Sequence, residues 1–196
     1  YRGIYMKINH VKKITNCQYL NLFSINYKDR INCEKEWIFA SRSKDLNPLE
    51  KDYTIPDAVV IVPVHIQENK LVVIKEFRVA LGGYQYGFPA GLIDNGETVE
   101  QAGKRELFEE TGLTLTKVLK KSPAIFSSSG MTDESISLLF VECEGKPTNN
   151  FNEASEDIDV IMLSREQASD ILYNPLIKFD VKSWIVLNTF VCQGVI

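Results

Sequence analysis

The sequence GLIDNGETVEQAGKRELFEETGL, from Gly91 to Leu113, decides the fold of this chain. Thr98, followed three residues later by Gln101, has the pattern of a capping box, which starts a helix. Gly112 is the residue type that commonly ends a helix in the left-handed conformation. The stretch therefore predicts a loop followed by a helix over about residues 98–111.

Glycines and apolar residues in this stretch predict how it packs. Gly91 and Gly96 bracket the loop, and glycine permits the positive φ that a sharp turn close to a ligand requires. In the helix, Val99, Ala102 and Leu107 supply apolar side chains for one face. We therefore expect a tight loop and a helix that packs its apolar face on a β-sheet.

Three carboxylates gather within one turn of the predicted helix. Residues three and four apart share a helix face, so Glu106 lies beside both Glu109 and Glu110. Like charges at this spacing cost an isolated helix about 0.2–0.5 kcal/mol per pair, a cost that a bound cation would reverse. Mg²⁺ prefers oxygen ligands and is usually held by one or two carboxylates plus substrate phosphates. Glutamate-rich helices are more often solvated surfaces, so the carboxylates alone leave a magnesium site and a solvated face both open.

The spacing of the whole stretch separates these alternatives. Every defined position of the Nudix hydrolase signature is filled, namely Gly91, five residues, Glu97, seven residues, Arg105-Glu106-Leu107, one residue, Glu109-Glu110, one residue and Gly112-Leu113. The chain therefore resembles the Nudix hydrolases. The resemblance implies an α+β fold, the Nudix α/β/α sandwich with a mixed β-sheet, and an enzyme that cleaves a nucleoside diphosphate linked to another moiety.

The resemblance also implies roles for residues in and beside the helix. The carboxylates that match the family's metal ligands are Glu106 and Glu110, and Glu109 is expected to bind a further ion or to support the ligands. Ala90 would offer its backbone carbonyl to the metal. Arg105 lies four residues before Glu109, so it can pair with that carboxylate and hold the cluster in shape, although a simple surface ion pair would be worth little. The expected cofactor is Mg²⁺, with Mn²⁺ as a substitute.

Sequence around the signature narrows the substrate. Three segments resemble the ADP-ribose pyrophosphatase branch of the family, which also handles other ADP-sugars: Glu76-Phe77-Arg78, Gly82-Gly83-Tyr84 and residues 88–94. The expected reaction is Mg²⁺-dependent hydrolysis of the pyrophosphate bond of ADP-ribose, or of a related ADP-sugar, to AMP and ribose 5-phosphate. We expect a nucleotide-sugar substrate and a homodimer.

One position departs from this branch and keeps two alternatives open. The loop that follows the signature commonly holds a proline where this chain has Ser129, so another nucleotide sugar such as GDP-mannose or UDP-glucose is an alternative substrate. A sensing Nudix domain, which binds a nucleotide sugar without cutting it, is the second alternative. The intact signature disfavours the sensing domain.

The branch also implies substrate contacts outside the signature. Arg78 is expected to contact the diphosphate or the terminal ribose, because a guanidinium matches phosphate oxygens; the alternative is an exposed charge at a strand end. Glu134 is expected to position the terminal ribose. Trp37 and Arg42 are expected to contact substrate from an N-terminal unit, since an aromatic residue of that unit stacks on adenine in relatives, often across a dimer. A core position is the alternative for Trp37.

The catalytic base of this branch comes from a loop outside the signature. The candidates in this chain are Glu153 and Glu156, and Glu156 matches the family position better because it lies directly before a predicted strand. Glu156 is expected to act as the base or as an additional metal ligand. Glu109, Glu110 and Arg105 complete the expected catalytic group.

Apolar periodicity organises the rest of the chain into two parts. Residues 1–50 are expected to form an antiparallel β unit for dimerisation or substrate contact, with strands over 20–25 and 36–40. Residues 55–196 are expected to form the Nudix domain. Its other expected elements are strands over 58–66, 70–77, 116–125, 136–142 and 159–163, a loop over 81–84, a helix capped by Ser164 and a helix over 179–190.

Composition excludes several classes of protein. The chain has 196 residues, of which 44% are hydrophobic and 24% charged, as in ordinary globular proteins. Its net charge of −4 gives no indication of a nucleic-acid surface. It contains no apolar run of about 18 residues that would span a membrane, and we expect no secretory leader. Nucleic-acid and membrane partners are therefore not expected.

Cysteine and histidine patterns give no sign of a zinc site or a disulfide framework. The cysteines lack CxxC spacing, and we expect them to be reduced and mostly structural in a cytoplasmic protein. The two histidines are isolated, so a surface or core role is expected for each. The residues concerned are Cys17, Cys33, Cys143, Cys192, His10 and His65.

Overall fold

The computed structural model describes residues 6–44 and 47–194 and divides into two compact units. The first unit comprises residues 1–57 and 124–136, and the second comprises residues 58–123 and 137–196. Segment 124–136 therefore joins the N-terminal unit although it lies far from it in the sequence. The division at residues 1–50 and 55–196 remains a prediction.

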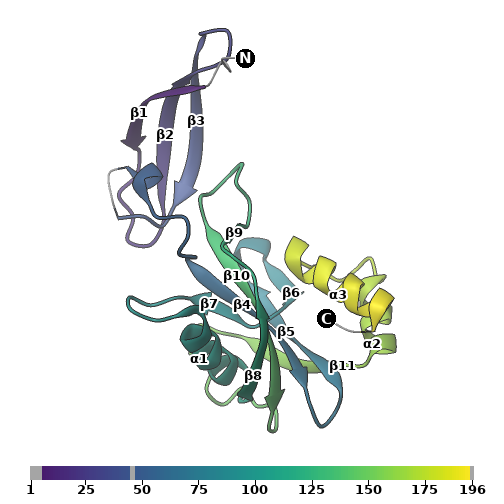
Figure 1. The fold of residues 1–196 in the computed structure, drawn as a ribbon. Coiled ribbons are helices and arrows are strands. Elements are labelled where there is room, and N and C mark those ends of the chain that lie inside the picture. The colour runs from purple at the N-terminus through teal and green to yellow at the C-terminus, as the bar shows by residue number, and fades with distance from the viewer. Residues whose placement is uncertain (1–5, 45–46, 195–196) are drawn as a thin grey trace. The chain divides into compact units, whose positions relative to one another are not determined.

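The first unit contains a three-stranded antiparallel sheet in the order β1-β2-β3 (Figure 1). Phe23 and Phe39 are paired on the neighbouring strands β2 and β3, and the centroids of their buried rings lie 5.8 Å apart. The sequence of β1 does not predict a strand, because only Ile8 and Val11 in it are apolar. The two strands expected here are confirmed. The bounds are β1 Lys7–Lys13, β2 Asn21–Lys28 and β3 Glu34–Ser41, followed by the 3₁₀-helix η1 at Pro48–Glu50.

The larger sheet is mixed, as the sequence predicts. Its strand order is β11-β5-β4-β10-β8, with β6 paired to β5, β7 to β4 and β9 to β10. Strands β4 and β10 run parallel, because Asp57 N donates to Ser135 O at 2.9 Å where the strands begin and Ile66 N donates to Cys143 O at 3.0 Å near their other ends. Strand β5 is antiparallel to β11 and β6. The bounds are β4 Ala58–His65, β5 Lys70–Arg78, β6 Gly83–Gly87, β7 Ala90–Leu92, β8 Thr114–Lys121, β9 Ile125–Phe126, β10 Ser135–Glu144 and β11 Ile158–Leu163.

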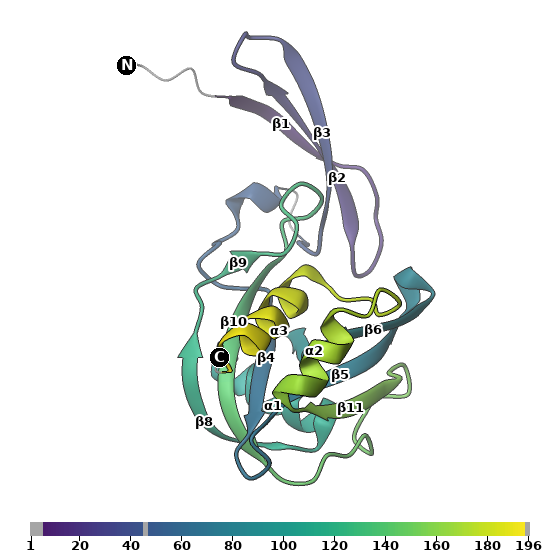
Figure 2. The ribbon, with the colours of Figure 1, turned by 90° about the vertical axis from the view of Figure 1, so that its right-hand side faces the viewer.

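Helices cover both faces of the second unit's sheet and confirm the α/β/α sandwich. Figures 1 and 2 show α1 (Val99–Thr111) on one face, and α2 (Arg165–Leu172) and α3 (Val181–Gln193) on the other. Val59 and Ile61 of β4 pack with α1 in a buried cluster, and strand alternation directs the buried residues between them to the opposite face. The apolar face predicted for α1 is therefore the face that packs on the sheet.

Local signals set the ends of the helices. The capping box of Thr98 and Gln101 is formed at the start of α1, and Gly112 ends that helix with a φ of 70°. Ser164 caps α2 as predicted. Helix α3 begins later than the predicted residue 179, because the Asp180 side chain accepts a hydrogen bond from Ser183 N and caps the helix there.

Two connections differ from the predictions. The loop expected over 81–84 is occupied by the 3₁₀-helix η2 (Val79–Leu81) and the start of β6, since Tyr84 pairs with Phe77 across the sheet. The single strand expected over 116–125 is divided into β8 and β9. Pro123 lies at this break, and proline has no N–H to donate to a strand ladder.

The cysteines are all free, but only one is in the core. Cys143 is fully buried, which raises the pKa of its thiol to about 12 and fits a structural role. The other three are exposed, and a structural role for them remains a prediction. His65 is a core residue that bonds Gly145 O at 2.9 Å, and His10 is exposed on β1. Within the described residues, no helix has the length and apolarity needed to cross a membrane.

Candidate active site

The carboxylates of α1 differ in how far they are buried. Glu110 is only 5% exposed, and its carboxylate accepts a hydrogen bond from Ala90 N of β7 at 3.3 Å. The Glu106 side chain is 13% exposed, whereas that of Glu109 is 48% exposed. The helix therefore directs Glu106 and Glu110 toward the sheet and leaves Glu109 at the surface.

Gly91 makes room for one of these carboxylates. It lies inside β7 without a positive φ, so the sharp turn expected at this glycine is wrong. A Cβ atom at Gly91 would overlap the carboxylate of Glu106. The missing side chain, rather than an unusual backbone, is what this position requires. Gly96 does have a positive φ, 88°, as expected for the turn.

Arg105 holds the signature together through its whole guanidinium group. It forms a bidentate pair with Glu97, with Nε to Oε1 at 3.1 Å and Nη2 to Oε2 at 2.9 Å. Its Nη1 contacts Glu106 at 2.7 Å and Glu109 at 3.2 Å, so the predicted pair with Glu109 is present. Nη2 also donates to Leu92 O at 3.0 Å. These contacts, chiefly the one with Glu97, raise the pKa of Arg105.

Four carboxylates influence one another beside α1 and β5. Burial raises the pKa of Glu110 well above its ordinary value, and the charges of Glu106 and Glu76 raise it further. Burial also raises the pKa of Glu106, against the opposing effect of Arg105. The charge of Glu156 also raises the pKa values of Glu76, Glu106 and Glu110. The sequence did not predict that Glu76 belongs to this group of carboxylates, because the motif that contains Glu76 indicated a family branch but no role for this residue.

The donor set fits a hard divalent cation. Among the described residues, no group of three or more His, Cys, Asp or Glu side chains forms a ready metal site. Arg105 engages Glu106, while Ala90 N engages Glu110. Buried carboxylate oxygens that repel one another are nevertheless the ligands such an ion prefers, and its charge would relieve their repulsion. The carbonyl role expected for Ala90 remains a prediction.

The other candidates of this unit lie at the ends of β5 and β11. Arg78 ends β5, and its Nη2 contacts Glu76 Oε2 at 2.7 Å while its side chain is 48% exposed. Glu156 is half-buried just before β11; its N–H donates to Glu153 O at 3.0 Å, and its Oε2 accepts from Glu153 N at 2.8 Å. Glu153 is exposed. Geometry therefore favours Glu156 over Glu153 as the residue near the cluster.

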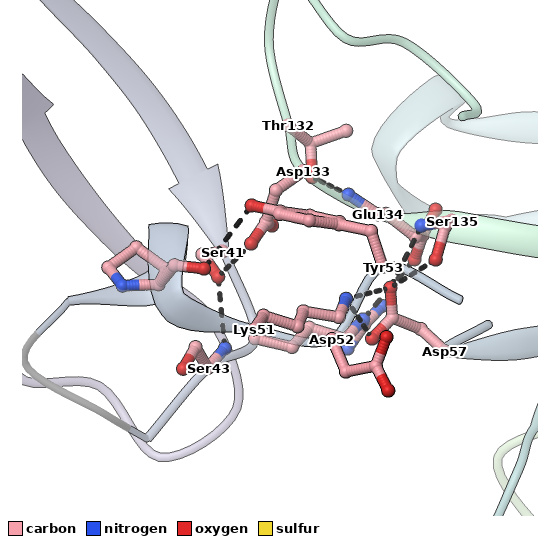
Figure 3. A network of polar contacts seen from close by, with 12 residues as sticks. Ser41, Ser43, Lys51, Asp52, Tyr53, Asp57, Thr132, Asp133, Glu134 and Ser135 are labelled. Carbon is pink, nitrogen blue, oxygen red and sulfur yellow. Dashed lines mark hydrogen bonds and ion pairs between the residues drawn. The ribbon is translucent and has the colours of Figure 1, made fainter. Parts of the chain in front are cut away.

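The remaining candidates belong to the first unit. Arg42 Nε lies 3.3 Å from Glu134 Oε1, and both line a pocket of about 420 Å³. Figure 3 shows the polar network of this unit, in which Ser41 Oγ donates to Asp133 Oδ2 at 2.8 Å. Trp37 is 49% exposed and lines a separate pocket of about 260 Å³, so the core alternative for this residue is wrong.

Curated proteins of known activity resemble this chain in sequence. The ADP-ribose pyrophosphatase of Saccharomyces cerevisiae is 32% identical over 142 residues, which cover 71% of this chain and 59% of the yeast protein. The ADP compounds hydrolase NudE of Escherichia coli (strain K12) is 46% identical over 77 residues, 37% of this chain and 40% of that protein. The chain thus spans 59% or less of the length of these two relatives.

A solved structure and a family model extend the likeness over more of the chain. The crystal structure of an ADP compounds hydrolase superposes with a TM-score of 0.73 at 19% identity and covers 99% of this chain and 98% of that one, which shows a shared fold. The family model of the NUDIX domain matches residues 54–184, a range that contains the complete signature and its carboxylates. The chain belongs to the NUDIX domain family.

Proposed function

We propose that the protein is a divalent-metal-dependent hydrolase that cleaves the pyrophosphate bond of ADP-ribose, or of a related ADP-sugar, to AMP and ribose 5-phosphate. The observation that carries this proposal is the group of buried carboxylates that α1 presents beside Ala90, with Glu106 and Glu110 at its centre. The name of the yeast relative supports the choice of ADP-ribose.

The proposed metal ligands are Glu106, Glu110 and the Ala90 carbonyl, with Glu109 available to a further ion. Mg²⁺ is the proposed ion, with Mn²⁺ as a substitute. When bound, the metal would neutralise diphosphate oxygens and lower the pKa of a bound water. Arg105 keeps Glu106 and Glu109 in position by contacting both carboxylates.

The side chains around these ligands would carry the remaining steps. Glu156 is proposed to accept a proton from the attacking water, whose oxygen forms a new bond to one phosphorus. The bond between that phosphorus and the bridging oxygen breaks, and the bridging oxygen leaves on the other phosphate. Arg78 would exchange its contact with Glu76 for diphosphate oxygens, since a guanidinium matches them well.

The first unit is proposed to supply further substrate contacts through Trp37, Arg42 and Glu134. Exposure of Trp37 supports a stacking role, and the pocket lined by Arg42 and Glu134 supports a polar one. We also propose a homodimer, which light scattering would test. The free cysteines favour a reducing compartment such as the cytoplasm.

A direct assay tests the proposed activity. The purified protein with Mg²⁺ and ADP-ribose is expected to release AMP and ribose 5-phosphate, and EDTA is expected to abolish the release. Comparison of kcat/KM for ADP-ribose, GDP-mannose and UDP-glucose would rank the substrates. Absence of hydrolysis for every nucleotide sugar, combined with tight binding of one of them, would refute the enzyme and support a sensing domain.

Ser129 favours one alternative within the same class of enzyme. It lines the 260 Å³ pocket together with Trp37, at the position where ADP-ribose pyrophosphatases commonly have proline. A change at this position alters the wall of a candidate base-binding pocket. A higher kcat/KM for GDP-mannose or UDP-glucose than for ADP-ribose would therefore assign the protein to a neighbouring specificity.

Gly91→Ala is expected to lower turnover without unfolding the protein. The new Cβ would overlap the Glu106 carboxylate and displace it from its place beside β7. A displacement of about 1 Å at a reacting site can cost about a hundredfold in rate, so we expect a loss of about ten- to a hundredfold. Gly130→Ala is the matched control, because nothing lies within 4 Å of a Cβ at that glycine. Equal turnover of the two variants would show that Glu106 does not need this space.

A further inference from the structure

The loop before β11 is tied to the sheet by a tyrosine. The Tyr84 hydroxyl of β6 donates a hydrogen bond to Asp157 Oδ2 at 2.6 Å, across 73 positions of sequence. Asp157 immediately follows Glu156, the proposed catalytic base. We propose that Tyr84 is a positioning residue, which anchors this loop through Asp157 and thereby holds Glu156 beside the carboxylates of the active site. This inference rests on the proposed function.

The Tyr84 ring is held firmly on the sheet. Phe77 is its cross-strand partner, and the two rings meet edge to face with centroids 5.4 Å apart. The Lys75 ammonium lies 4.3 Å from the centre of the Tyr84 ring, a cation–π distance, and the same ammonium pairs with Asp159 of β11 at 3.3 Å. The ring that carries the hydroxyl thus contacts two residues of β5, one of which also pairs with β11.

Asp157 is held through its backbone as well as its side chain. Its carbonyl accepts a hydrogen bond from Phe77 N at 3.0 Å, which extends the pairing of β5 with β11 by one position. The hydrogen bond to Asp157 also raises the pKa of Tyr84. The loop before β11 is therefore attached to β5 and β6 at Asp157, its C-terminal end.

The other end of the loop is fixed on α1. The ring of Phe151 packs on Phe108 with centroids 4.7 Å apart and planes tilted by 30°. Between the two anchors, Glu153 and Glu156 close a turn by bonding each other. The Phe108 contact and the Tyr84 bond therefore hold the turn between α1 and β6. Release of one anchor should let Glu156 leave the position from which its charge reaches Glu106 and Glu110.

Tyr84→Phe tests the anchor because it removes the hydroxyl but keeps the ring against Phe77 and Lys75. We expect kcat for ADP-ribose to fall about tenfold, a rise of about 1.4 kcal/mol in the barrier, with little change in KM. Hydrogen exchange of the backbone over residues 149–157 is expected to become faster. Tyr86→Phe, which removes a hydroxyl from the same strand, is the matched control and is expected to change neither quantity.

Asp157 variants separate anchoring from a general structural effect. Asp157→Ala is expected to match Tyr84→Phe, and the double variant is expected to be no worse than either single one, because both remove the same bond. Asp157→Asn retains an oxygen acceptor for the Tyr84 hydroxyl and is expected to keep more activity than Asp157→Ala. Thermal unfolding of each variant checks that the fold is retained.

The outcomes distinguish this inference from the proposed function. Wild-type kcat and unchanged exchange in Tyr84→Phe, or additive losses in the double variant, would overturn the anchor. A wild-type protein that hydrolyses no nucleotide sugar would overturn the proposed function instead. In that case the exchange comparison alone decides whether Tyr84 anchors the loop, and unchanged exchange would reject it.

Discussion

Glu110→Gln is expected to lower the kcat for ADP-ribose at least about a hundredfold, because the substitution removes a buried charge that the reaction requires. Glu110 is 5% exposed and accepts a hydrogen bond from Ala90 N. The amide oxygen of glutamine has the same shape and can accept that bond. The loss should therefore appear in turnover rather than in folding, and initial rates at saturating substrate would measure it.

The same substitution is expected to leave the metal-free protein at least as stable as the wild type. Burial and neighbouring carboxylates raise the pKa of Glu110, so the folded protein binds this proton more tightly than the unfolded chain does. Stability contributed by this group therefore falls as the pH rises above the ordinary pKa of glutamate, and the neutral amide avoids that loss. Thermal unfolding in EDTA should show a Tm for Glu110→Gln that is equal to or above that of the wild type.

Thermal unfolding with Mg²⁺ tests whether Glu110 binds the metal. A ligand that binds the folded state alone raises its stability, so Mg²⁺ should raise the Tm of the wild type more than that of Glu110→Gln. Glu100→Gln is the matched control on the same helix, since Glu100 is paired with Lys121 at 2.7 Å and lies outside the carboxylate group. Near-normal turnover by Glu110→Gln would remove Glu110 from the metal site.

Glu156→Gln is expected to lower kcat by about a hundred- to ten-thousandfold, the usual contribution of a general base. Glu156 is half-buried and its charge reaches Glu76, Glu106 and Glu110, whereas Glu153 is exposed. We therefore expect Glu153→Gln to retain near wild-type turnover. Steady-state kinetics of both variants across pH would measure the difference.

The pH profile separates a base from an additional metal ligand at Glu156. Loss of a base should remove the acidic limb of the kcat profile and should not be reversed by more Mg²⁺. Loss of a ligand should instead raise the Mg²⁺ concentration needed for half-maximal rate. The reverse order of effects, with Glu153→Gln inactive and Glu156→Gln active, would assign the base to Glu153.

Local sequence predicted the helix that carries the site because its determinants lie close together in the chain. The capping box connects residues three apart, Gly112 ends the helix within one turn of its last carboxylates, and Arg105 meets Glu109 four residues later. The apolar face of α1 follows the helical repeat in the same way. Interactions of this range depend little on the rest of the fold.

Strand β6 and Gly91 show where local reasoning failed. Two consecutive glycines before Tyr84 are typical of a loop, but pairing with β5 makes this segment a strand. Gly91 has the residue type of a turn, yet it lies in β7, where it pairs with Val59 of β4, and the carboxylate of Glu106 occupies the space of its side chain. Neither neighbour is visible in the sequence around these glycines.

By itself, the sequence determined the signature helix, its caps, the type of ligand it presents and the mixed sheet that it covers. Only the tertiary structure brought Glu76 to the other carboxylates and joined the Tyr84 hydroxyl to Asp157. The physical reason is the separation along the chain between the residues that interact. Helix signals act over three or four residues, whereas contacts such as Tyr84 to Asp157 join strands that the chain brings together only when the sheet forms.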